Sequence, residues 1–190
     1  MALDRLRRQG KIRYYGITAL GETAALHRVI DAGVLDTAQV CYNVLEPSAG
    51  AAVPAGFPAQ DFGRLLDHTR RQSVGVIVIR VLAAGALSGT ETRHPVAVPS
   101  VEPIASGPDY ATDVRRARRL EALVRGGHAG RLVEAALRFP LGADAVSTVL
   151  LGYSSQEHLE YAAASMAKGP LPPAALAELG TLWQQLAADG

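Results

Sequence analysis

Short runs of apolar, mostly β-branched residues alternate along this chain with longer stretches in which apolar residues recur every three or four positions. The first spacing predicts β-strands and the second predicts amphipathic helices. The four expected strands lie at residues 12–17, 37–42, 74–82 and 146–151. The expected helices lie at residues 2–9, 22–32, 61–71, 114–124, 131–139, 154–167 and 172–188.

The segment 74–82 (VGVIVIRVL) is the most apolar part of the chain and is typical of a strand that is buried on both faces. Such strands belong to parallel sheets that are covered by helices. Strands that alternate with helices imply right-handed crossovers, so we expect an α/β fold over residues 1–190. Residues 89–108 carry several prolines and form a loop that is long enough to be functional or disordered.

The amino-acid composition excludes several classes of function. Hydrophobic residues make up 48% of the 190 positions and charged residues 19%, as in a globular protein. The formal net charge of +1 gives no electrostatic reason to expect a nucleic-acid or membrane partner. No secretory signal and no run of 18 apolar residues is visible, so we expect a cytoplasmic protein. Cys41 alone can form neither an internal disulfide nor a thiolate metal cage, and we expect it to be a small core residue.

In parallel α/β folds, ligands bind at the carboxyl ends of the strands, so the residues that follow each strand carry the most information. After the fourth strand, Gly152 precedes a segment in which Ser154 and Glu157 have the spacing of a capping box. The same glycine and helix start could instead bind a phosphate, and the two interpretations are compatible. The small residues of the segment 82–89 allow either a ligand contact or close packing, and Gln39 is either a satisfied buried amide or a ligand-binding one.

General acid–base groups are scarce at these strand ends. The five histidines fall on expected helices or loops without metal-ligand spacing, and no nucleophile motif is present. Tyr14 and Tyr15 lie in an expected strand, where packing is their expected role. The arginines at positions 115, 116, 118 and 119 are expected to form a solvated helix face. We therefore assign no catalytic and no metal-binding residue.

Four segments resemble motifs of the aldo-keto reductase family, and they come in the family's order. They are GKIRYYGIT at residues 10–18, QVCYNVL at 39–45, the segment 76–89, and LGYSSQEHLE at 151–160. The resemblance implies the second half of a (β/α)8 TIM barrel, with parallel strands five to eight and their flanking helices. It also implies a nicotinamide cofactor, NADP with NAD possible, and a small carbonyl substrate.

The family's catalytic Asp, Tyr, Lys and His lie on earlier strands, so none is carried over to this chain. We therefore expect a cofactor-binding half that is inactive alone, and whether the chain is an enzyme stays open. The alternative is a non-catalytic binding or interaction module, or a truncated relic. Four strands cannot close a barrel, so a complementary half or self-association is expected.

The resemblance also implies a set of cofactor-binding residues. Thr18 and Gln39 match the side chains that bind the nicotinamide carboxamide, and Leu82 and Ala84 match backbone positions along the pyrophosphate. Gly152, Ser154, Ser155 and His158 match the adenosine-phosphate motif. Four positions depart from the family pattern: Ala19 and Ala162 replace asparagines, Ile79 replaces an aromatic residue that stacks on the nicotinamide, and Arg80 replaces a serine. His158 stands at a common arginine position.

Overall fold

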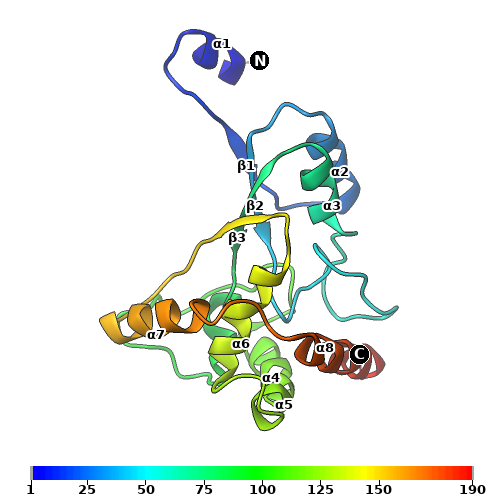
Figure 1. Cartoon of the computed structure of the whole chain (residues 1–190), viewed down its shortest axis with the longest axis vertical. Helices are drawn as coiled ribbons and strands as arrows, with labels where there is room; N and C mark the ends of the chain where they lie inside the picture. Colours follow the sequence, from blue (N-terminus) through cyan, green and yellow to red (C-terminus); the bar gives the residue numbers. More distant parts are fainter. Residues whose placement is uncertain (1, 190) are drawn as a thin grey trace.

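The computed structural model describes residues 2–189 and shows a four-stranded parallel sheet with helices (Figure 1). The strands are β1 (Gly16–Thr18), β2 (Thr37–Cys41), β3 (Gly75–Ile79) and β4 (Val146–Val149). The helices are α1 (Ala2–Arg8), α2 (Thr23–Asp31), α3 (Leu65–Arg71), α4 (Tyr110–Leu120), α5 (Ala122–Arg125), α6 (Leu132–Arg138), α7 (Gln156–Met166) and α8 (Pro173–Ala188). Two 3-10 helices, η1 (Ala83–Ser88) and η2 (Phe139–Gly142), complete the elements.

The strands are ordered β1-β2-β3-β4, so each one pairs with its neighbour in the sequence. Every pair is parallel. The register aligns one row across the sheet: Thr18, Gln39, Ile77 and Thr148. The expected α/β class and parallel sheet are therefore confirmed.

The two faces of this sheet differ in burial. Ala38 and Val40 of β2, together with Val76 and Val78 of β3, are completely buried and form part of the apolar core. The other face, which we call the open face, carries the row from Thr18 to Thr148, and none of those four residues is buried. Parallel sheets are normally covered on both faces. The prediction that strand 74–82 is buried on both sides is therefore wrong for the open face.

The first strand is shorter than expected, and its tyrosines lie outside it. Tyr15 N–H donates to the Asp36 carboxylate at 2.9 Å, and the Tyr15 hydroxyl donates to Asp4 at 2.7 Å. Tyr14 is 68% exposed. The prediction that Tyr14 and Tyr15 pack inside a strand is wrong, because contacts to α1 and to the loop before β2 replace strand pairing here.

Helix α3 begins four residues later than expected. Gly63 and Arg64 have φ of 57° and 59°, in the left-handed region, and the Asp61 side chain accepts from Gly63 N–H at 2.8 Å. Because these two residues are left-handed, the helix begins only after them, at Leu65. Helix α4 starts earlier than expected, at Tyr110, because the Asp109 side chain caps it by accepting from Thr112 N–H at 2.7 Å.

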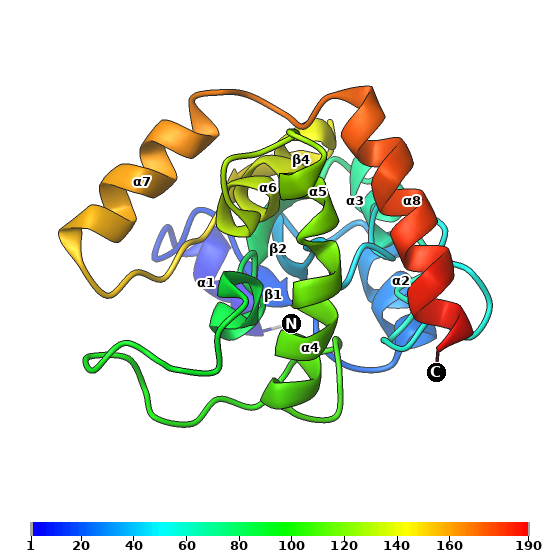
Figure 2. The ribbon, with the colours of Figure 1, turned by 90° about the horizontal axis from the view of Figure 1, so that it is seen from below.

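The long loop 89–108 connects η1 to α4 and extends along the lower edge of the molecule in Figure 2. The same view shows α7 and α8 on opposite sides of the molecule, with α4 and α5 between them. Arg116 is mostly buried and donates to the Ser106 carbonyl at 2.6 Å, whereas Arg115 donates within its own helix to Thr112 at 2.7 Å. The arginine run is thus only partly a solvated face. No helix within residues 2–189 is long and apolar enough to cross a membrane.

Candidate functional site: a groove between the η1 turn and helix α7

A strained turn follows β3. Arg80, Ala83 and Ala84 have φ of 58°, 46° and 58°, and Gly85 has φ of 104°. Side chains with a Cβ rarely adopt this left-handed conformation, which costs on the order of 1 kcal/mol or more per residue. Three such residues lie within five positions of the chain, so the turn needs strong local contacts to hold its conformation.

Two side chains from other segments hold this turn. Buried Asn43, just after β2, donates to the Arg80 carbonyl at 2.9 Å while its own oxygen accepts from Leu45 and Glu46 N–H. Arg93, in the long loop, donates to the Ala84 carbonyl at 2.8 Å. The turn is thus fixed at both ends by donors that the sequence places 37 and 9 residues away.

Two adjoining hollows form one groove beside this turn. The larger has a volume of about 790 Å³ and the smaller about 260 Å³. Leu82, Leu151 and Gly152 line both of them. The larger hollow runs on between α6 and α7, where Leu132, His158 and Tyr161 line it. A pocket of several hundred Å³ at the carboxyl end of a parallel sheet is the usual place for a small-molecule ligand.

Six of the ten residues implied by the family resemblance line this groove. Ile79, Arg80, Leu82, Ala84 and Gly152 line the smaller hollow, and Leu82, Gly152 and His158 line the larger one. Ser154 and Ser155 follow Gly152 and Tyr153 and lead into α7. Thr18 and Gln39 lie apart from both hollows, on the open face, where Thr18 donates to the Gln39 amide oxygen at 3.2 Å. That amide is therefore neither deeply buried nor part of the apolar core.

The start of α7 differs in detail from the expected capping box. Ser155, rather than Ser154, is the N-cap, and its hydroxyl accepts from His158 N–H at 3.3 Å. A hydrogen bond from the Ser155 hydroxyl lowers the pKa of Glu157. A Cβ added at Gly152 would meet no atom within 4 Å, so packing does not require glycine there. The open space at Gly152 fits the close approach of a ligand to the backbone.

Basic and acidic side chains line the larger hollow. Arg125, Arg131 and His158 face it together with Glu121 and Glu157. The Arg131 guanidinium lies 5.1 Å from the Tyr161 ring, a cation–π contact that orients its planar group. His94 of the long loop packs edge-on against His158 with ring centroids 5.6 Å apart. The donor set therefore includes groups that can bind a phosphate, beside an apolar floor.

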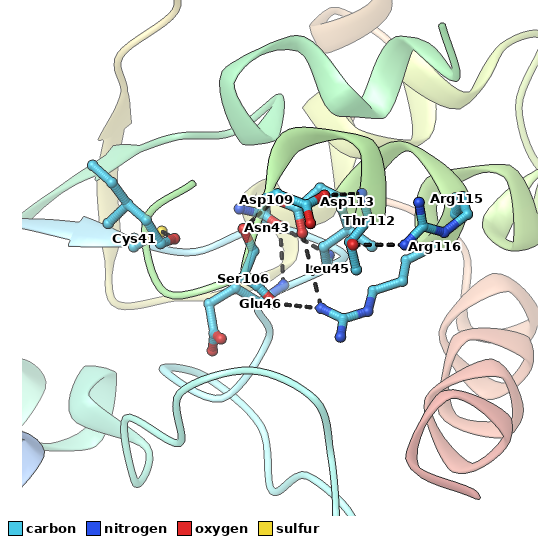
Figure 3. A network of polar contacts seen from close by, with 11 residues as sticks. Cys41, Asn43, Leu45, Glu46, Ser106, Asp109, Thr112, Asp113, Arg115 and Arg116 are labelled. Carbon is cyan, nitrogen blue, oxygen red and sulfur yellow. Dashed lines mark hydrogen bonds and ion pairs between the residues drawn. The ribbon is translucent and has the colours of Figure 1, made fainter. Parts of the chain in front are cut away.

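A buried polar network links β2, the long loop and α4 (Figure 3). Cys41 is buried as expected and donates to the Ile104 carbonyl at 3.5 Å, and burial raises the pKa of its thiol to about 12. Ser106 donates to buried Asp113, whose pKa burial raises. These contacts, with Arg116, anchor the end of the long loop above the carboxyl end of β2.

Sequence reasoning gave no role to four residues that shape the site: Asn43, Glu46, Arg93 and Asp113. Asn43 follows a strand, which is a usable signal, because such positions face the ligand edge of the sheet. The other three lie in a loop or on a helix face. Nothing in their spacing distinguishes them from solvated side chains.

Comparisons with known proteins agree with this arrangement. The model of the aldo/keto reductase family matches residues 1–184. The holo form of aldo-keto reductase AKR11C1 from Bacillus halodurans superimposes with a TM-score of 0.61 at 21% identity, covering 96% of this chain and 53% of that one. Its apo form gives 0.60 at 21% identity, covering 96% and 54%. No curated protein matches the sequence.

These matches describe the fold as well as the family. This chain spans about half the length of either AKR11C1 structure. The four parallel strands with their helices are consistent with part of a (β/α)8 barrel. Because the family model covers nearly all of the sequence, this chain belongs to the aldo/keto reductase family.

Proposed function

We propose that this chain is the cofactor-binding C-terminal half of an NAD(P)H-dependent aldo-keto reductase that acts on a carbonyl substrate. The observation that carries the proposal is the groove between the η1 turn, the end of β4 and the start of α7. It collects residues from two of the four segments that resemble the family's motifs, residues 76–89 and 151–160. A bound nicotinamide cofactor would supply the hydride for carbonyl reduction, and the chain would bind and orient it.

The proposed roles follow the order of residues along the sheet edge. Thr18 and Gln39 would bind the nicotinamide carboxamide, with Ile79 and Arg80 beside it. Leu82 and Ala84 would lie along the pyrophosphate. Gly152, Ser154, Ser155 and His158 would hold the adenosine phosphate. Arg125 and Arg131 on the wall of the larger hollow favour NADP, with its additional phosphate, over NAD.

We further propose that catalysis needs a second part. The family's Asp, Tyr, Lys and His have no counterparts among the four motifs of this chain, so it would bind the cofactor but not complete the reaction alone. The open face of the sheet supports this view, because Ile77 and Ile79 on it are only half-buried. The expected occupant is a half that carries the remaining strands.

A binding titration combined with a turnover assay tests this function. The purified chain is titrated with NADPH and NADH, followed by cofactor fluorescence, and then assayed with a simple aldehyde. We expect binding, tighter for NADPH, without turnover. Turnover by the chain alone would contradict its inactivity, and loss of all cofactor binding would contradict the cofactor site and leave a relic as the better description.

Gly152→Leu provides the matched variant. Position 152 opens onto the groove, and a Cβ there would meet no atom within 4 Å. The variant should therefore fold normally, with the leucine side chain occupying the binding space. We expect at least tenfold weaker NADPH binding with an unchanged melting temperature. Gly180→Leu, on α8, is the control, because a Cβ there also meets no atom within 4 Å and lies outside both hollows. Equal binding by the two variants would place the cofactor elsewhere.

A further inference from the structure

The long loop 89–108 contacts the strained turn through Arg93, and Arg80 of the turn donates to the Glu102 carbonyl of the loop at 3.4 Å. The Arg93 guanidinium donates to the Ala84 carbonyl at 2.8 Å, and its Nε donates to the Val98 carbonyl at 2.7 Å. The same group lies 5.2 Å from the ring of Tyr110, the first residue of α4. One side chain thus connects the turn, the middle of the loop and the start of a helix.

The residue that Arg93 contacts has a left-handed backbone conformation, which alanine rarely adopts. Ala84 has φ of 58° and ψ of 18°, and Gly85 follows with φ of 104°. Within the turn, Gly85 N–H donates to the Leu82 carbonyl at 2.8 Å. Since an alanine in this conformation costs on the order of 1 kcal/mol or more, the turn would relax if its carbonyl lost a charged donor.

Close packing around Gly85 shows that Arg93 and Tyr110 lie directly over the turn. A Cβ at Gly85 would come within 3.3 Å of the Tyr110 hydroxyl and 3.6 Å of an Arg93 terminal nitrogen. The arginine therefore lies directly against the backbone. Leu82 and Ala84, which belong to the same turn, line the groove.

From these contacts we infer that Arg93 is a positioning residue, which holds the η1 turn in its left-handed conformation and so shapes the floor of the cofactor groove. The inference rests on the proposed function for the identity of the ligand. Arg93 does not line either hollow, so it acts through Ala84 rather than by touching the ligand. Lysine at this position could keep the charge but not the two hydrogen bonds and the planar stacking.

The test compares the variants R93M, R93K and A84G and the double variant R93M/A84G in the full chain. Dissociation constants for NADPH come from fluorescence titration, and backbone protection of residues 82–89 comes from hydrogen exchange. We expect R93M to weaken NADPH binding about tenfold and to speed exchange in this segment, with R93K between R93M and the wild type. Glycine adopts φ of 58° without strain, so A84G should restore at least a third of the lost affinity in the R93M background.

Arg115→Met is the matched control, since Arg115 donates to Thr112 on its own helix and should leave both measurements unchanged. An R93M variant with wild-type affinity and wild-type exchange in residues 82–89 would overturn the inference. So would R93M losing affinity without any recovery by A84G, because the arginine would then act by some other route. If the wild type binds neither NADPH nor NADH, the proposed function fails. Hydrogen exchange of residues 82–89 then still tests Arg93 by itself, and a wild-type exchange rate in R93M would overturn its positioning role.

Discussion

Two polar side chains, Asn43 and Glu46, bond the backbone just after β2, where Val44 and Leu45 also pack into the core. Asn43 bonds three backbone groups, and Glu46, three residues later, is completely buried. One Glu46 oxygen accepts from Ser48 N–H at 3.1 Å and from the Ser48 hydroxyl, while the other has no partner within the described residues. Burial raises the pKa of Glu46 to about 8, although both Ser48 hydrogen bonds oppose the shift.

This raised pKa makes folding stability depend on pH. The folded protein keeps the Glu46 proton up to about pH 8, whereas an unfolded glutamate loses it near pH 4. The contribution of Glu46 to stability is therefore complete below about pH 4 and is lost as the pH rises through about 8. The slope approaches about 1 kcal/mol per pH unit between these limits.

Glu46→Gln should remove this slope. Glutamine carries no charge to bury and keeps the oxygen that accepts from Ser48, so we expect the variant to be more stable than the wild type at pH 8.5. Urea denaturation at pH 5.5, 7.0 and 8.5 measures the difference. Glu102→Gln, at an exposed loop position, is the control and should keep the wild-type slope. An unchanged slope in Glu46→Gln would show that Glu46 ionises freely in the folded protein.

At the scale of elements, α6 is joined to the segment between α7 and α8 by a partly buried ion cluster, in which Glu134 is buried and Lys168 is exposed. Glu134 is nearly inaccessible and accepts from Lys168 Nζ at 2.8 Å, from Arg138 at 3.1 Å and from Gly130 N–H at 3.2 Å. Burial would raise the pKa of Glu134, but these hydrogen bonds outweigh it and lower the pKa. Arg138 continues the cluster by donating to the Gly169 and Pro170 carbonyls.

Glu134→Ala should lower the free energy of unfolding by about 2 kcal/mol at pH 7, because it leaves the mostly buried Arg138 guanidinium without its acceptor, whereas the exposed Lys168 can turn to solvent. Since the folded-state pKa is lowered, the stabilisation is complete above about pH 4 and is lost as the pH falls through the folded value. The difference from the wild type should therefore shrink on acidification to pH 3. Denaturant titrations at both pH values measure it. The exposed Glu160→Ala variant is the control, and an equal loss there would argue against a special role for the cluster.

The order of strands and helices could be predicted from the sequence, since each strand is a short β-branched run and each helix has an apolar stripe. The residues at which the strands and helices begin and end could not be predicted, because side chains distant in the sequence determine them. Asp36 ends the pairing of the first strand, and a left-handed Arg64 delays α3. The groove residues came from motif resemblance. Arg93 and Glu46 stayed hidden because their roles depend on tertiary contacts that no spacing records.

At the scale of the whole molecule, the sheet is well covered on one face and weakly covered on the other. Within residues 2–189, the edge strands β1 and β4 each have only one neighbour in the sheet. Unpaired strand edges are templates for association, and half-covered apolar residues add to the tendency. Leu150, which follows β4, is 57% exposed. A closed barrel would cover all of these groups, so we expect the isolated chain to associate with another chain.

In the absence of a complementary half, copies of this chain should associate through the open face. We expect sedimentation velocity at micromolar concentration to show species larger than the 20.0 kDa monomer. Ile77→Asp adds a charge to the middle of the open face without touching the buried side of β3, so it should shift the distribution towards monomer. Leu176→Asp, at an exposed position on α8, is the matched control and should not. A wild-type chain that sediments at 20.0 kDa and unfolds in one cooperative step would show that four strands suffice, and the partner would then be unnecessary for the fold.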